Sequence, residues 1–466
     1  MKASREWLEE YSDIDVDSTS LCDILTMTGS KVETLEETGK DIKNVVVGKI
    51  LEIKKHPDAD KLVVTKVDVG NEKLQIVTGA DNISKGDIVP IAKDGAELPG
   101  GIKIKTGKLR GIESCGMMCS VGELNLELAD YPGQIEHGIM ILPKTLEKDL
   151  GKDIVEVLNL REDIIDFEIT PNRPDCLSIE GLGRETAVSL EKEFKNPRGN
   201  LDKLNIPDKD EIEGLKVDIK APDLCYRYIA RVVKNVKIGE SPEWMKRRLK
   251  ACGVRSINNI VDITNYVMLE LGQPMHAFDI NSIEGKHITV RRANKQEKIT
   301  TLDEQERILD ENDLVIADEK KPVAIAGLNS EIEEDTKTVV FESAVFYGGS
   351  VRKTAKKVGL RTESSSRFEK GLSSENALRA INRAVELVEK LGAGEPINAK
   401  IDVYPTKQKI NKIPVDSKKI NTLLGLNLTE KQMIDILEKL DIKVENNIAT
   451  APYFRMDLEF WQDLAE

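Results

Sequence analysis

The first regular pattern of apolar positions along the chain is helical. Leu21, Ile24 and Leu25 recur at the three- and four-residue spacing of one helix face. Asp17 stands where a helix cap is expected, and Gly29 follows the last apolar position as a stop signal. The pattern therefore predicts a short amphipathic helix close to the N-terminus.

Short apolar runs typical of β-strands replace this pattern from residue 45 onward. Turn residues rich in Pro, Gly, Asn and Asp separate the runs. The predicted strands cover residues 45–53, 62–69, 74–78, 88–91 and 102–105. Five short strands within about 80 residues favour a small closed barrel of the OB type. Such a barrel can bind single-stranded or looped nucleic acid.

Helical and strand patterns alternate in the rest of the chain. Residues 193–214 are polar and predict a linker, and residues 215–400 predict a large mixed α/β block. From about residue 405 a small α/β module begins, in which Thr429 and Gln432 form a capping box. Its helix carries an apolar face made by Met433, Ile436, Leu437 and Leu440. The chain stops within a helical pattern that has no stop signal, and we expect a cut there.

Composition excludes several classes of protein. The chain has 466 residues, a net charge of −14 and 40% hydrophobic residues, which suits several soluble domains. No apolar run approaches the ~20 residues that span a bilayer, and no signal segment opens the chain. Six cysteines are too few for a disulfide framework, and Cys115 and Cys119 lack the second ligand pair of a zinc site. We therefore expect a cytoplasmic protein with reduced thiols and no membrane partner.

The acidic average hides three basic islands, at residues 101–112, 231–255 and 352–370. Nucleic-acid binding needs cationic surface, so the islands matter more than the average. The first island contains no acidic residue, and its cations are Lys103, Lys105, Lys108 and Arg110. These four residues are a candidate rim for a nucleic-acid backbone. On charge alone, a solvated hairpin is the stronger interpretation.

Polar residues interrupt an apolar stretch between residues 253 and 279. The stretch includes Thr264, Asn265 and His276. Polar groups among buried apolar ones are hydrogen-bonded or reserved for a ligand. From the pattern alone, a structural role for His276 is favoured over a functional one.

Three carboxylates, Asp457, Asp463 and Glu466, lie at the end of the chain. Asp463 and Glu466 share a helix face, and carboxylate oxygens are the ligands that Mg²⁺ prefers. A solvated acidic face is the stronger interpretation of the pattern alone.

Five motifs, in order along the chain, resemble the N-terminal portion of the bacterial phenylalanyl-tRNA synthetase β subunit family. They are HPDADKL at 56–62, KLRGIES at 108–114, TPNRPDCL at 170–177, the polar stretch at 253–279, and GLRTES with RFEKG at 359–371. The resemblance covers essentially the whole chain. In this family an α₂β₂ heterotetramer attaches phenylalanine to tRNA(Phe), and the α subunit holds the site that uses ATP. The β subunit supplies tRNA contacts, a proofreading site and much of the subunit interface.

The resemblance implies an α+β multidomain fold. An OB-fold β-barrel at 41–150, which binds tRNA, is inserted in an N-terminal α/β domain at 1–40 with 151–200. A large mixed α/β editing domain of the B3/B4 type covers 210–400. A small winged-helix-like module of the B5 type, truncated here, covers 405–466.

The resemblance also implies an editing site that hydrolyses tRNA(Phe) mischarged with tyrosine. Glu342 would receive the tyrosine hydroxyl, and His276 would lie beside the ester. Thr264 and Asn265 would shape the pocket and place water or the terminal ribose. Residues 328–331, Leu-Asn-Ser-Glu, replace a double-glycine stretch common in the family. A non-catalytic tRNA-binding or assembly subunit with a degenerate pocket is therefore the alternative, and a free-standing editing hydrolase is a third.

Family members use carboxylates at the positions of Asp457, Asp463 and Glu466 for a Mg²⁺ site associated with the α subunit. The following position, usually another acid, is absent from this chain. The resemblance thus raises the Mg²⁺ interpretation above the one that the pattern alone favours.

Overall fold

The computed structural model describes residues 1–199, 201–301, 305–326, 332 and 335–466. The chain forms two compact units: a smaller one, Glu36–Ile164, and a larger one, Met1–Leu35 with Ile165–Glu466. Both helices and several sheets are present, so the predicted mixed α and β character is confirmed. Among the described helices, none has both the length and the apolar character that crossing a bilayer requires. The limits predicted for the individual domains stay a prediction.

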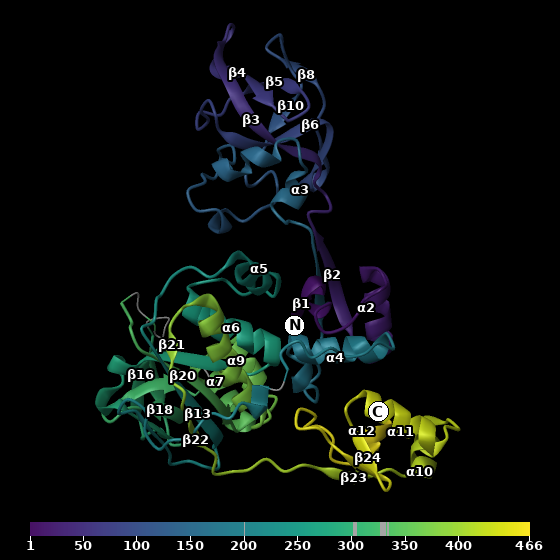
Figure 1. Ribbon diagram of the computed structural model, residues 1–466, viewed down its shortest axis with the longest axis vertical. Coiled ribbons are helices and arrows are strands. Elements are labelled where there is room, and N and C mark those ends of the chain that lie inside the picture. Colours follow the sequence, from purple (N-terminus) through teal and green to yellow (C-terminus); the bar gives the residue numbers. More distant parts are fainter. Residues whose placement is uncertain (200, 302–304, 327–331, 333–334) are drawn as a thin grey trace. The chain divides into compact units, whose positions relative to one another are not determined.

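The smaller unit is built on a six-stranded sheet (Figure 1). Its strand order is β10-β6-β3-β4-β5, with β7 beside β6. The strands are β3 (Lys43–His56), β4 (Ala59–Asp68), β5 (Lys73–Thr78), β6 (Ile88–Leu98), β7 (Ile102–Lys103) and β10 (Gly116–Met118). A separate hairpin pairs β8 (Gly107–Leu109) with β9 (Ile112–Ser114). Five of these strands overlap the five short apolar runs that the sequence predicted as strands.

The closed barrel that was predicted for this unit is not confirmed. The described strands pair along an open path whose ends are β10 and β5. Cys115 N donates to Gln75 O at 2.8 Å, which links the two ends at one point. Gly116 has φ +140°, and a Cβ there would lie 2.5 Å from Ala92 O, so only glycine allows β10 to pair this closely with β6. The OB-type barrel therefore stays a prediction.

The N-terminal part of the larger unit combines a three-stranded sheet with short helices. The sheet order is β1 (Lys2–Ser4), β11 (Glu162–Phe167) and β2 (Val32–Thr38). The helices are α1 (Arg5–Leu8), α2 (Ser18–Met27) and α4 (Ile179–Ser189). The predicted N-terminal helix is confirmed, because the Asp17 side chain accepts a hydrogen bond from Ser20 N and caps α2.

The central part of the larger unit contains two sheets. The first has the order β14-β20-β13-β21, with β22 also paired to β13. Its strands are β13 (Cys225–Lys234), β14 (Met275–Asp279), β20 (Val339–Phe346), β21 (Glu395–Pro396) and β22 (Ile401–Val403). The second has the order β12 (Lys216–Ile219), β15 (His287–Arg292), β18 (Leu314–Ala317) and β19 (Pro322–Ile325). A hairpin of β16 (Glu297–Thr300) and β17 (Glu306–Leu309) follows β15.

Helices pack around these sheets and bury their apolar residues. They are α5 (Glu243–Ala251), α6 (Asn259–Leu271), α7 (Gly348–Val358), α8 (Glu363–Phe368) and α9 (Asn376–Leu391). The helix α6 contacts β14 and α9, and α9 contacts β13 and β20. Every residue of β20 is buried.

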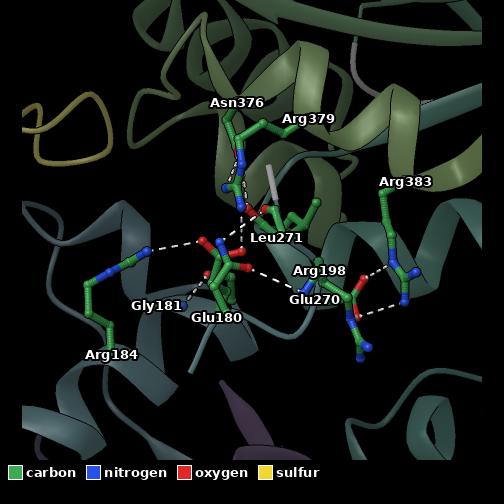
Figure 2. Close-up of polar contacts among 12 residues, drawn as sticks. Glu180, Gly181, Arg184, Arg198, Glu270, Leu271, Asn376, Arg379 and Arg383 are labelled. Carbon is green, nitrogen blue, oxygen red and sulfur yellow. Dashed lines mark hydrogen bonds and ion pairs between the residues drawn. The ribbon is translucent and has the colours of Figure 1, made fainter. Parts of the chain in front are cut away.

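Two buried carboxylates link these helices to α4 and to residue 198 (Figure 2). Glu180 pairs with Arg184 at 3.0 Å and with Arg379 at 2.8 Å. Glu270 pairs with Arg198 and Arg383, each at 2.7 Å. Because each buried charge has two guanidinium partners, the cost of removing it from water is offset.

The C-terminal module has its own small core. A three-stranded sheet of β23 (Lys412–Pro414), β25 (Ile448–Thr450) and β24 (Lys443–Glu445) packs with α10 (Ser417–Leu424), α11 (Glu430–Lys439) and α12 (Trp461–Ala465). The capping box at Thr429 and Gln432 is present, which confirms the start of α11. Met433 and Leu437 are buried, whereas Ile436, which was predicted to lie on the same apolar helix face, is 48% exposed. A winged-helix arrangement stays a prediction.

Candidate functional site

The structure brings His276 and Glu342 together on one face of the central sheet. His276 on β14 and Glu342 on β20 are directly opposite partners in an antiparallel pair. Ala230 on β13 is the partner of Glu342 on the other side. Side chains directly opposite in an antiparallel pair lie on the same face, and so do residues two apart on one strand. Tyr228 therefore shares this face with His276 and Glu342.

Among the described residues, no cation accompanies the buried carboxyl group of Glu342. Its side chain accepts a hydrogen bond from the Tyr228 hydroxyl, with Oη and Oε2 2.6 Å apart, and the residue is 1% exposed. Burial removes the charged form from water and raises the pKa of Glu342 to about 8, although the bond from Tyr228 acts in the opposite direction. At neutral pH this carboxyl is mostly the neutral acid.

The imidazole of His276 is also kept uncharged. Burial lowers the pKa of His276 to about 4, because a protonated ring would lose its hydration. A neutral imidazole has one ring nitrogen that can accept a hydrogen bond or a proton from water. The pair thus offers a neutral base and a neutral acid side by side at pH 7.

The helix α6 carries Thr264 and Asn265. Its first turn is fixed by Asn258, whose side chain accepts hydrogen bonds from two backbone amides, and it ends at Gly272 with φ +77°. Thr264 is buried and donates its hydroxyl proton to Val261 O at 2.7 Å. Asn265 is half-buried. Within the described residues no hydrogen bond joins either side chain to Glu342, so α6 lies against β14 as a wall and not as a direct partner.

Two further aspects of the site concern what the sequence could reveal. The departure from the family pattern at 328–331 lies outside the described residues. Tyr228 was not predicted from the sequence, because it lies in a largely apolar run that is typical of any buried strand. Only the register of β13 against β20 places its hydroxyl on Glu342.

The four predicted rim residues lie on the surface of the smaller unit. All are exposed: Lys103 in β7, Lys105 after it, Lys108 in β8, and Arg110 in the turn before β9. Lys103 pairs with Glu97 at 3.0 Å. Across the fully described smaller unit, Lys105, Lys108 and Arg110 make no ion pair with an acidic side chain. These three cations are therefore available to an external anion.

The three carboxylates predicted as magnesium ligands are engaged separately. Asp457 pairs with Arg455 through two hydrogen bonds of 2.9 and 2.7 Å. Asp463 Oδ2 accepts from the amides of Glu459 and Phe460 at the start of α12, and Glu466 is exposed. They do not converge on a common point in the described chain, so Mg²⁺ at this position stays a prediction.

One group of potential metal ligands does converge among the described residues. It consists of Asp175, Cys176 and Glu185. Arg173 donates to both carboxylates, at 2.9 Å to Asp175 and 2.5 Å to Glu185. A guanidinium therefore already supplies the positive charge that a metal ion would bring.

A cavity of about 230 Å³ lies away from the His276–Glu342 pair. It is lined by residues 406–411, 451–453 and 455–456 together with Tyr226, Leu372, Ser374 and Glu459. None of the predicted site residues lines it. Its position does not support a role in the same chemistry.

Three family models match the chain. They are described as a putative tRNA binding domain at residues 45–146, a B3/4 domain at 224–393 and a tRNA synthetase B5 domain at 413–466. The B3/4 match contains Thr264, Asn265, His276 and Glu342, and the tRNA-binding match contains the four rim residues.

Curated relatives match over the whole chain. The phenylalanine–tRNA ligase beta subunits of Clostridium acetobutylicum and Clostridium tetani are each 48% identical over 475 and 478 residues, with 100% of this chain and 59% of each relative covered. The corresponding subunit of Syntrophus aciditrophicus is 43% identical over 482 residues. The chain thus spans about 59% of the length of the first two relatives.

One solved structure with a related name also matches. It is an N-terminal fragment of the phenylalanyl-tRNA synthetase beta-subunit from Pyrococcus horikoshii, with 17% identity and a TM-score of 0.31. The match covers 66% of this chain and 86% of the fragment.

Proposed function

The chain belongs to the family of bacterial phenylalanine–tRNA ligase beta subunits, matching their N-terminal portion, and from this premise we propose that it binds tRNA and hydrolyses tRNA(Phe) mischarged with tyrosine. In this proposal an α subunit completes an α₂β₂ ligase and uses ATP, with Mg²⁺, to attach phenylalanine. The observation that carries the editing part is the buried His276–Glu342 pair, which no cation compensates among the described residues.

Selection of tyrosine follows from the burial of Glu342. A hydrophobic synthetic pocket rejects an added hydroxyl only by about 10², so phenylalanine enzymes have a use for a second site. A buried carboxyl oxygen that has no hydrogen-bond donor destabilises the complex by about 1–3 kcal/mol. The phenolic hydroxyl of tyrosine supplies a donor to Oε1 of Glu342, whereas the phenylalanine ring leaves that oxygen unpaired beside the Tyr228 hydrogen bond on Oε2. The site therefore favours the wrong amino acid, as an editing site must.

The proposed reaction is hydrolysis of the ester between tyrosine and the terminal ribose. Water attacks the ester carbonyl carbon, and the bond to the ribose oxygen breaks. The products are free tyrosine and tRNA with its ribose hydroxyl restored. The neutral imidazole of His276 orients the water and accepts its proton, which then passes to the ribose oxygen. Thr264 and Asn265 on α6 form the adjoining wall and help to position the ribose.

A deacylation assay tests the editing proposal. Tyr-tRNA(Phe) is incubated with the chain, alone and with an α subunit, and released tyrosine is measured over time. We expect Glu342→Ala and His276→Ala to lower the rate by about 10²–10⁴, the range typical of positioned acid–base groups. The matched control is Glu395→Ala, which removes an exposed carboxyl from β21 of the same sheet. Unchanged hydrolysis in both site variants would overturn the proposal.

The exposed cations of the smaller unit support a tRNA-binding role of their own. Each Lys or Arg contact to phosphate releases condensed counterions, so binding weakens as salt rises. The triple variant with Ala at Lys105, Lys108 and Arg110 should bind tRNA more weakly and show a shallower salt slope. Lys43→Ala is the control, because Lys43 is already paired with Glu97 at 2.7 Å. Retained tRNA binding together with absent hydrolysis, with or without α, would favour the non-catalytic subunit with a degenerate pocket.

A further inference from the structure

Glu342 already receives a phenol from the protein itself. The Tyr228 hydroxyl donates to Oε2 at 2.6 Å, and both residues are almost fully buried. This is the hydrogen bond that a tyrosine substrate would offer to the same carboxyl. In the described residues, Tyr228 makes the only hydrogen bond to this side chain that the structure shows.

The position of Tyr228 is fixed by the sheet around it. On one side of β13 it pairs with Ala344 of β20, and on the other with Val403 of β22. The residue has no exposed surface, so its ring is held by packing on an inner strand. Its hydroxyl therefore holds Oε2 in one place, and Oε1 is left for another donor.

We propose that Tyr228 is a specificity-determining positioning residue, whose hydroxyl occupies Oε2 of Glu342 and so presents Oε1 to the phenolic hydroxyl of a misacylated tyrosine. This inference rests on the proposed editing function and names how that site recognises its substrate. A carboxyl that can rotate freely must be ordered when substrate binds, whereas one held by a hydrogen bond is already oriented. The enzyme's phenol and the substrate's phenol then lie on the two oxygens of one carboxyl.

The arrangement predicts a change of protonation when tyrosine binds. Hydrogen bonds donated to a carboxylate favour its charged form, and two phenols donate where one did before. Of the titratable groups on the neighbouring strands, those that lie opposite Glu342 or interact electrostatically with it are His276 on β14, and Tyr228 and Cys225 on β13. The pKa of His276 is lowered to about 4, and those of Tyr228 and Cys225 are raised well above their usual values, all by burial. Near neutral pH, Glu342 is therefore the group of this set that changes charge.

Tyr228→Phe tests the inference, because it removes one oxygen and keeps the ring. Hydrolysis of Tyr-tRNA(Phe) and of Phe-tRNA(Phe) is measured with the full chain, alone and with an α subunit. We expect kcat/KM for the tyrosyl ester to fall about tenfold, as for the loss of one hydrogen bond to a charged group, while the phenylalanyl ester is unaffected. The ratio of the two rates should fall by the same factor.

The pH dependence of the hydrolysis rate distinguishes positioning of Glu342 by Tyr228 from a purely structural role of Tyr228. The carboxylate is the form that accepts two phenols, so activity on the tyrosyl ester should rise with pH as Glu342 loses its proton. Removing the Tyr228 hydroxyl removes a bond that lowers the pKa of Glu342. The rise should therefore move to higher pH in Tyr228→Phe. Spontaneous ester hydrolysis is subtracted with a protein-free blank at each pH.

Tyr266→Phe is the matched control. Tyr266 is another fully buried tyrosine of the larger unit, and its hydroxyl accepts a hydrogen bond from Arg248 at 2.8 Å. Its loss should change neither the tyrosine preference nor the pH profile. If Tyr228→Phe fails to fold, 3-fluorotyrosine at residue 228 supplies a second variant with a stronger donor, and the profile should then move to lower pH.

The outcomes distinguish this inference from the function on which it rests. Suppose that Glu342→Gln loses hydrolysis while the residue 228 variants keep the wild-type preference for the tyrosyl ester and the wild-type pH profile. That result would overturn the role of Tyr228 alone. Wild-type protein that hydrolyses no tyrosyl ester, with or without α, would overturn the editing function and this inference with it.

Discussion

Glu342 should make the fold less stable as the pH rises, and Glu342→Gln should remove that cost. Glutamine has the shape of the neutral acid, and its oxygen can still accept the Tyr228 hydrogen bond. The carboxyl has an ordinary pKa of 4.5, but burial raises it to about 8 in the fold. Between these values the folded state keeps a proton that the unfolded state has lost. The free energy of unfolding therefore decreases with pH over this range.

The pKa values set the size of the effect. Each pKa unit is worth about 1.36 kcal/mol, so the rise from 4.5 to about 8 corresponds to at most about 5 kcal/mol. Relaxation of the pocket around a charge reduces this figure, and we expect about 2–4 kcal/mol at pH 8. The loss is absent below pH 4.5, where both states are protonated, and complete above pH 8.

Urea unfolding at pH 5, 6, 7 and 8, followed by tryptophan fluorescence, measures the difference. The three tryptophans, Trp7, Trp244 and Trp461, all belong to the larger unit that contains Glu342. The advantage of Glu342→Gln over wild type should grow by about 1 kcal/mol per pH unit. Glu395→Gln, at an exposed position, should show no such trend. A difference that stays constant with pH, or a variant that is less stable at pH 8, would refute the reasoning.

Three further predictions concern the larger unit. Glu270→Gln should cost about 3 kcal/mol in urea unfolding, because two buried guanidinium groups lose their shared partner, although each keeps a second carboxylate nearby. Gly181→Ala should lower the free energy of unfolding by about 1–3 kcal/mol in the same assay, since the new Cβ would lie 2.0 Å from Asp175 O. Gly239→Ala is the control, because a Cβ there meets no atom within 4 Å. Acid titration followed by circular dichroism should show the stability of the fold falling below about pH 4.5. Burial alone would raise the pKa of Glu180, but Arg379 and Arg184 outweigh it and lower this pKa. Protonation of the carboxylate at low pH therefore removes ion pairs that stabilise the folded state.

Local features of the fold were predictable because local chemistry determines them. Asp17 caps α2, and Thr429 caps α11, because short polar side chains satisfy amide groups at a helix start. The strands of the smaller unit were predictable in the same way, because turn residues separate its short apolar runs. The exposure of Ile436 was not predictable, because a helix pattern shows which residues share a face but not how wide a surface the neighbouring sheet covers.

The candidate site was only partly predictable. The resemblance singled out His276 and Glu342, but their direct opposition depends on a strand register between segments far apart in sequence. Register follows from packing of the whole sheet, which no local pattern reports. At Asp457 the resemblance suggested a metal ligand, yet the side chain of Arg455 donates to both of its carboxylate oxygens.

Three buried glutamates of the larger unit differ in whether a cation compensates their charge. Glu180 and Glu270 are each held by two arginines, so their burial is compensated within the fold. Glu342 is as deeply buried, but a neutral phenol is its partner. A fold selected for stability alone would supply a cation or replace the carboxyl, since an uncompensated buried acid costs free energy at neutral pH. The retention of this cost at the residue opposite His276 is the physical argument for the proposal that Glu342 binds a second donor from outside the chain.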